Sequence, residues 1–142
     1  FKSIYERGDE FARNKFILDR NNMLAKSKNI KFIQLNSLKL TINSLPKNKF
    51  DLIWIDGAHG YPIVCSDITN AISLSNKNAI LMCDDIWKNL KISDPIYSSV
   101  GAYETLEAFH SAGIINSDYF YKRLGKKFLS YEKFISLSKL KI

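Results

Sequence analysis

Two short apolar runs stand out from the pattern of hydrophobic and polar positions along the chain. Residues 50–55 (FDLIWI) are nearly all apolar and stop at an Asp-Gly pair, and residues 79–83 (AILMC) stop at Asp84-Asp85. Runs of this kind, rich in β-formers and ended by polar residues, are typical of strands that are buried on both faces. Residues 30–35 predict a further short strand.

The spacing of the other apolar residues predicts three helices. Residues 9–26 have helix-forming composition without Gly or Pro, which favours the first helix. Residues 61–75 predict the second, with Pro62 in its first turn. Its expected buried stripe is Val64, Ile68, Ala71 and Ile72. The third helix has Gly113 as its expected C-cap, on the same face as Ala102, Leu106 and Phe109.

The C-terminal part carries two aromatic-rich stretches, residues 119–124 and 128–137, with Gly125-Lys126 as a turn between them. This pattern predicts an antiparallel hairpin. The alternation of buried strands and helices before it predicts an α/β layered fold with a mainly parallel sheet and flanking helices. We expect the 142 residues to form a single domain.

Carboxylates follow both apolar runs, and the ligand crevice of an open α/β sheet lies beyond the carboxyl ends of its strands. If the two strands are parallel neighbours, Asp56, Asp84, Asp85 and His59 converge at one edge. Like charges placed together need a cation or a proton to relieve them. The group therefore suits a divalent metal such as Mg²⁺ or a general acid/base pair with His59.

Each of these residues also has a purely structural interpretation. Asp56 can shape its turn, as Asp-Gly pairs often do, and Asp84 or Asp85 can cap the next helix. His59 can be a solvated loop residue. Sequence alone leaves these alternatives open.

Composition excludes several classes of protein. The chain has 46% hydrophobic and 25% charged residues, which is ordinary for a globular protein. The basic residues behind its net charge of +7 are scattered, apart from Lys122, Arg123, Lys126 and Lys127, so we do not expect a nucleic-acid surface. No apolar run reaches the roughly 20 residues that span a bilayer, and no secretory signal is visible, which predicts a cytoplasmic protein. Cys65 and Cys83 lack metal-ligand spacing and are expected to be buried free thiols.

The strand-end motifs resemble those of the class I (Rossmann-like) S-adenosylmethionine-dependent methyltransferases. FDLIWIDGAHGYPIVCSDITNAISL resembles the fourth strand and following helix of one subgroup, in which Asp-Gly-x-His and an aromatic residue precede a helix that carries an Asp. AILMCDDIW resembles the fifth strand of sugar and small-molecule O-methyltransferases, which ends in Asp-Asp. KFIQLNSLKL resembles the third strand, and the C-terminal hairpin resembles the sixth and seventh.

The resemblance implies a role for each matched residue. Asn36 and Ser37, after the third strand, would approach the adenine of S-adenosylmethionine, and Asp56 with Gly57 would complete the cofactor contacts. In metal-dependent relatives the strand-four Asp and the strand-five Asp pair bind Mg²⁺ near the acceptor oxygen. These positions are Asp56, Asp84 and Asp85 here. His59 would be the general base, with Asp85 as a second catalytic residue.

The sequence also departs from the family pattern. It contains no G-x-G loop and no identifiable acidic residue for the ribose. In the family, strands one and two lie between strands three and four, so the chain is expected to be the C-terminal portion of a longer methyltransferase domain. The expected activity is O-methylation of a sugar or another small molecule. The alternatives are a non-catalytic Rossmann-like binding module and a metal-dependent hydrolase. A homo-oligomer is left open.

The missing glycine-rich loop generates a prediction about cofactor affinity. Glycines normally permit the close backbone approach that the methionine and ribose parts of the cofactor need. The 142-residue chain is therefore expected to bind S-adenosylmethionine weakly or not at all in isothermal titration calorimetry. Micromolar binding would mean that the residues present suffice.

Overall fold

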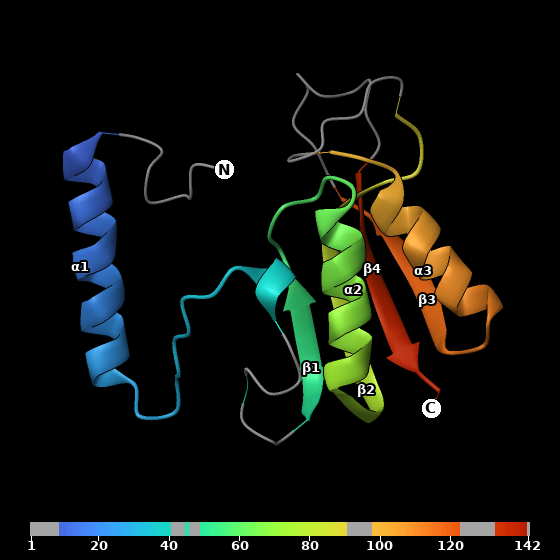
Figure 1. Ribbon diagram of the computed structural model, residues 1–142, viewed down its shortest axis with the longest axis horizontal. Helices are drawn as coiled ribbons and strands as arrows, with labels where there is room; N and C mark the ends of the chain where they lie inside the picture. The colour runs from blue at the N-terminus through green and yellow to red at the C-terminus, as the bar shows by residue number, and fades with distance from the viewer. Residues whose placement is uncertain (1–8, 41–44, 46–48, 91–97, 123–132, 142) are drawn as a thin grey trace. The chain divides into compact units, whose positions relative to one another are not determined.

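The computed structural model describes residues 9–40, 45, 49–90, 98–122 and 133–141. The chain divides into two compact units, Phe1–Leu35 and Asn36–Ile142, and each is described by itself. The arrangement of helices and strands within each unit can be followed in Figure 1. No helix among the described residues is long and apolar enough to cross a membrane.

The first unit contains helix α1 (Glu10–Lys26), which confirms the helix predicted from composition. It begins where the Asp9 side chain accepts a hydrogen bond of 2.7 Å from the Ala12 amide, an N-cap contact. The strand predicted at residues 30–35 is wrong, because these residues have no regular secondary structure. A strand needs a neighbour for its backbone groups, and the described part of this unit offers none.

The second unit is built on a four-stranded sheet with the order β1-β2-β4-β3. Its strands are β1 (Phe50–Ile55), β2 (Ser75–Trp87), β3 (Ile115–Tyr121) and β4 (Lys133–Leu140). β1 and β2 are parallel, whereas β2 with β4 and β3 with β4 are antiparallel. The prediction of a mainly parallel sheet is therefore wrong, and the sheet is mixed. The antiparallel β3–β4 pair was predicted, but its turn lies outside the described residues.

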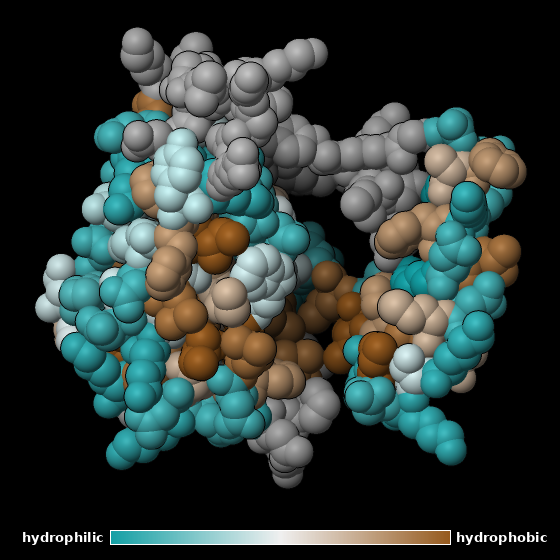
Figure 2. All heavy atoms as spheres, turned by 180° about the vertical axis from the view of Figure 1, so that it is seen from behind, coloured by the Kyte–Doolittle hydropathy of each residue, from teal (hydrophilic) through white to brown (hydrophobic). Residues whose placement is uncertain are grey.

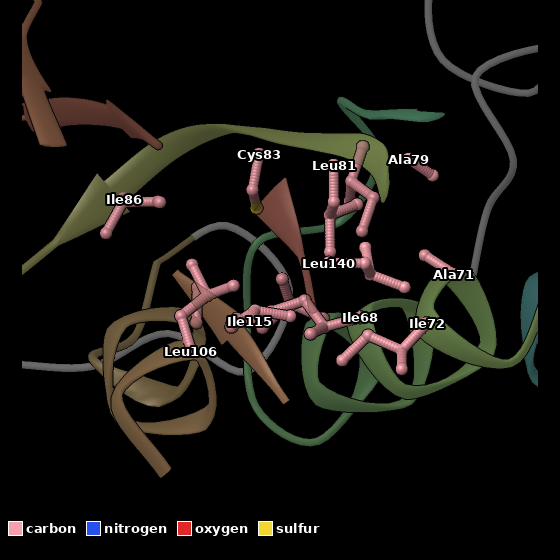
Figure 3. Packing of buried hydrophobic residues seen from close by; sticks show 13 residues of the cluster. Ile68, Ala71, Ile72, Ala79, Leu81, Cys83, Ile86, Leu106, Ile115 and Leu140 are labelled. Atoms are coloured by element: carbon pink, nitrogen blue, oxygen red, sulfur yellow. The ribbon is translucent and has the colours of Figure 1, made fainter. Parts of the chain in front are cut away.

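Helices α2 (Ile63–Leu74) and α3 (Gly101–Ser111) cover one face of this sheet (Figure 1). Between them and the sheet lies the hydrophobic core, to which α2, α3, β2, β3 and β4 all contribute (Figure 3). The predicted stripe of α2 is buried, as are Ala102 and Leu106 of α3. Gly113 follows the end of α3 with φ of +74°, which confirms the predicted helix end.

The opposite face of the sheet exposes hydrophobic side chains, which Figure 2 shows from that side. Leu52 is 59% exposed and Trp54 is 46% exposed, and their cross-strand neighbours on β2 are Ile80 and Met82. β1 was predicted to be buried on both faces, and this is wrong. β1 ends the sheet, and among the described residues of this unit no helix covers its second face.

Strand β2 is longer than its apolar run. It was expected to end at Cys83, but the strand continues through Asp84-Asp85 to Trp87. The ladder to β4 shifts register between Cys83 and Ile86, and Asp85 has φ of +50°. An irregularity of this kind is a β-bulge, which changes the direction in which side chains point in the middle of a strand. The two carboxylates therefore belong to a bulge within β2 and do not follow the strand.

A Leu→Ala substitution is expected to lower the free energy of unfolding by different amounts on the two faces of the sheet. Leu81→Ala on β2 removes a fully buried side chain and should lower the free energy of unfolding by about 2–5 kcal/mol. Leu52→Ala on neighbouring β1 should cost about 0.5 kcal/mol or less, because its side chain is largely exposed. Urea denaturation of both variants measures the difference. Equal losses would show that the outer face of β1 is covered.

Candidate active site at the carboxyl edge of the parallel strands

The parallel ladder brings the predicted strand-end carboxylates to one edge of the sheet. Ile55 of β1 lies opposite Cys83 of β2, so Asp56 and Asp84 come next at the same level. This confirms the predicted parallel pair and the shared edge. The polar side chains at this edge form two groups, one after β1 and one in the bulge of β2.

His59 belongs to the first group and is held in place. Its side chain is 11% exposed, and its Nε2 atom lies 3.7 Å from the Oδ1 atom of Asp56. Its backbone carbonyl accepts a hydrogen bond of 3.3 Å from the Ser99 hydroxyl. Its Nδ1 atom is buried and has no hydrogen-bond partner among the described residues. The solvated-loop interpretation of His59 is therefore wrong.

Asp67 of α2 also belongs to this group, although the sequence analysis gave it no role in the site. Burial raises the pKa of its carboxyl group, while a hydrogen bond with Ser37 and the charge of His59 act in the opposite direction. Its Oδ1 atom is buried without a hydrogen-bond partner among the described residues. A signal was present in the sequence, because position 67 shares a helix face with buried Val64 and Ile68.

A cavity of about 420 Å³ opens beside this group. Its polar lining comes from Ser37, Asp56, Gly57 and Asp67. The rest of its wall is apolar and consists of Leu40, Leu45, Phe50, Leu52, Ile53, Trp54, Ile55, Ala71 and Leu74. A concave, largely apolar site with a few convergent polar groups is the usual form of a small-molecule site.

Three of the four predicted cofactor residues, Ser37, Asp56 and Gly57, thus line the same cavity. The fourth, Asn36, does not line it and caps the 3₁₀ helix η2 (Ser37–Lys39) instead. Its side-chain oxygen accepts a hydrogen bond of 3.0 Å from the Leu38 amide. Asn36 therefore positions Ser37 at the cavity wall.

The second group consists of Asp84 and Asp85 with two lysines. The Lys122 ammonium donates to both carboxylate oxygens of Asp84, at 2.8 and 2.7 Å, and to Asp85 Oδ1 at 2.7 Å. The Lys133 ammonium donates to Asp85 Oδ2 at 2.6 Å. The helix-cap interpretation of the two aspartates is wrong, because both lie within β2, and the next helix that the structure describes, α3, has Val100 as its N-cap residue.

These contacts shift the ionisation of the charged groups. Burial alone would raise the pKa of Asp85, but the hydrogen bonds from Lys122 and Lys133 outweigh it and lower that pKa. Burial would lower the pKa of Lys122, and its hydrogen bonds to Asp84 and Asp85 raise it instead. The charged forms of both partners are therefore stabilised.

The predicted Mg²⁺ ligands do not form one cluster. No group of three or more His, Cys, Asp or Glu side chains within the described ranges could hold a metal ion. Asp56 lies by His59, whereas every carboxylate oxygen of Asp84 and Asp85 accepts a hydrogen bond from an ammonium group. As arranged, a hard cation would have to compete with an ammonium group at every carboxylate oxygen of the aspartate pair.

The two thiols differ in their surroundings. Cys83 is buried, as predicted, and burial together with nearby aspartates raises its pKa to about 12. Cys65 was also expected to be buried but is only half-buried, with its Sγ atom 3.5 Å from the Gly101 carbonyl oxygen. Both are free thiols.

The burial of Asp67 generates a prediction for stability against pH. Its folded-state pKa lies above its unfolded value of about 3.9, so its contribution to stability falls as pH rises through the folded pKa. Asp67→Asn should therefore raise the melting temperature at pH 7 and leave it nearly unchanged at low pH. Asp118→Asn, at an exposed position of β3, is the control. A lower melting temperature of Asp67→Asn at pH 7 would contradict the burial argument.

Solved structures with a similar fold include O-methyltransferases, at identities that show similarity of fold alone. A putative O-methyltransferase from Klebsiella pneumoniae has a TM-score of 0.64 and 17% identity over 92% of this chain and 59% of its own. Cofactor-bound Rv0187 from MTB has a TM-score of 0.63 and 18% identity over 92% of this chain and 56% of its own. The Bacillus cereus O-methyltransferase in complex with SAH has a TM-score of 0.53 and 17% identity, covering 70% of this chain and 44% of its own.

The chain thus spans little more than half the length of the first of these structures. No curated protein sequence matches it. The family model described as "Methyltransferase domain" matches residues 6–86, which include β1, α2 and nearly all of β2. The match covers more than half of the chain and includes Asp56 after β1 and the bulge of β2 that carries Asp84 and Asp85. The chain belongs to this methyltransferase domain family.

Proposed function

We propose that this chain forms the acceptor edge and part of the cofactor pocket of an S-adenosylmethionine-dependent O-methyltransferase that acts on a sugar or another small molecule. The observation that carries the proposal is the polar end of the cavity that runs along β1. Ser37, Asp56 and Asp67 meet there, with His59 beside them. Membership of the methyltransferase domain family supports it.

The charge at this edge fits a cationic cofactor. Asp56 and Asp67 line the cavity, and neither is among the carboxylates that form an ion pair with a lysine or arginine in the described residues. A cation placed near a half-buried carboxylate favours its charged form and offsets the cost of its burial. S-adenosylmethionine carries a positive sulfonium centre, and when bound it supplies the methyl group for an in-line displacement.

The polar end of the cavity offers further hydrogen-bonding groups to such a ligand. The Ser37 hydroxyl and the backbone at Gly57 are hydrogen-bonding groups at the polar end, and the β1 side chains form an apolar wall. The predicted role of Asn36 becomes indirect in this proposal, since its side chain holds the turn that presents Ser37.

His59 is the proposed general base. The acceptor hydroxyl would give its proton to Nε2 of His59. The Asp56 carboxylate, 3.7 Å away, stabilises the imidazolium that forms. Exclusion of water from the buried side of the ring strengthens this attraction.

A matched pair of histidine variants tests this function. In the complete gene product that carries this chain, His59→Ala should lower the rate of S-adenosylhomocysteine formation with hydroxyl acceptors by about 10²- to 10⁴-fold, at an almost unchanged melting temperature. His110→Ala is the control, because its Nδ1 accepts a hydrogen bond of 3.1 Å from the Ser117 amide. That variant should lose stability and keep its rate.

Two results would contradict the proposal. A His59→Ala enzyme with an undiminished rate would remove His59 as the base. Cofactor binding without methyl transfer to any hydroxyl acceptor would favour the non-catalytic binding module instead.

A further inference from the structure

The bulge of β2 holds a charge-balanced group that the proposed reaction does not use. Two carboxylates, Asp84 and Asp85, face two ammonium groups, Lys122 and Lys133. All four carboxylate oxygens accept a hydrogen bond from a lysine, at distances from 2.6 to 2.8 Å. The ion pairs are partly shielded from water, since the side chains are between 12% and 32% exposed.

The backbone is arranged to bring both carboxylates to the same cation. Consecutive residues in a regular strand point to opposite faces of the sheet. At this bulge Asp85 has φ of +50°, and its amide donates to Asp84 Oδ1 at 2.8 Å. The Lys122 ammonium can therefore bridge the two side chains.

The two lysines come from the paired strands at the end of the sheet. Lys122 directly follows β3 and Lys133 begins β4, and the Lys122 amide donates to the Lys133 carbonyl at 2.8 Å. The Lys133 ammonium also stands 4.9 Å from the centre of the Trp87 ring. The cations are thus fixed by neighbouring backbone and by a ring.

We propose that Lys122 takes the place of a divalent cation at the Asp84–Asp85 pair, so that this methyltransferase edge works without a metal. The inference rests on the proposed function for its relevance to catalysis, but not for its geometry. Lys122 is a positioning residue: through the two aspartates it neutralises the bulge and fixes it beside the β1 end that carries Asp56. Mg²⁺ can bind here only if it displaces the ammonium groups from their oxygens.

Terbium luminescence tests the proposal directly on this chain. Tb³⁺ is an oxygen-seeking cation, and the Trp87 ring beside Lys133 is placed to sensitise its emission. The wild-type protein should show no saturable Tb³⁺ signal below millimolar concentration. Lys122→Met should gain a saturable signal, which the double variant with Asp84→Asn should lose. Mg²⁺ should compete with Tb³⁺ for the site of Lys122→Met.

Two further variants separate the effect of this lysine from changes in folding and net charge. Lys122→Arg keeps the cation and should remain without a Tb³⁺ site. Lys139→Met removes a charge from an exposed position of β4 that is not among the Asp84 and Asp85 contacts, and it should behave like the wild type. Circular dichroism verifies that each variant is folded.

Either of two results would overturn the inference. One is saturable binding of Tb³⁺ or Mg²⁺ by the wild-type protein that Asp84→Asn abolishes, a result that needs no lysine variant. The other is a folded Lys122→Met protein that gains no site. The cation experiment does not depend on methyl transfer. If it gives the expected result while the complete gene product transfers no methyl group, the proposed function fails and the lysine substitution stands.

Discussion

The parallel pairing of β1 with β2 is the constraint on which the rest of this site depends. Because Ile55 lies opposite Cys83, Asp56 after β1 and Asp84 in the bulge of β2 reach the same edge. Helix α2 connects the two strands and buries Val64 and Ile68 against the sheet, so the crossover fixes both the register and the position of Asp67. A slip of one residue would turn the buried side chains of β2 to the exposed face. The site is thus a consequence of core packing as much as of its own polar residues.

Two kinds of carboxylate lie along this edge, and their neighbours explain the difference. Asp67 is half-buried with a carboxylate oxygen unpaired among the described residues, so the charged form costs free energy until a cation approaches. Asp85 is also partly buried, but two ammonium groups stabilise its charge. The first environment suits a bound sulfonium centre, whereas the second has already been neutralised by the protein. Under the proposed function, the cationic cofactor would therefore bind on the β1 side of the edge.

Local sequence patterns predicted the structural features that depend on residues close together in the chain. The apolar run of β1, the stripe of α2 and the Gly113 helix end were all visible, because each depends on neighbouring residues along the chain. The predicted strand at residues 30–35 failed because a strand also needs a partner, which an apolar run does not guarantee. The exposed face of β1 was missed for a related reason, since composition shows that a side chain is apolar but not what covers it.

The lysines could not be assigned from sequence for a different reason. Lys122 lies 38 residues from Asp84, and Lys133 lies 48 residues from Asp85. Only the insertion of β4 between β2 and β3 brings them together. The polar pair after an apolar run was interpreted as the end of a strand, whereas β2 continues through it by a bulge. The sequence correctly predicted that Asp56 and Asp84 lie at one edge. It did not predict the lysines that pair with Asp84 and Asp85.

At this edge Asp67 of α2 forms no ion pair with a lysine or arginine among the described residues, whereas Asp85 is neutralised by two lysines. Carbon-13 NMR of the aspartate carboxyl carbons, followed through an acid titration of the folded protein, measures both in one sample. The account predicts that Asp67 titrates above the ordinary value of about 3.9 and Asp85 below it. The reverse order, or two carboxyl groups that titrate together at the ordinary value, would contradict it.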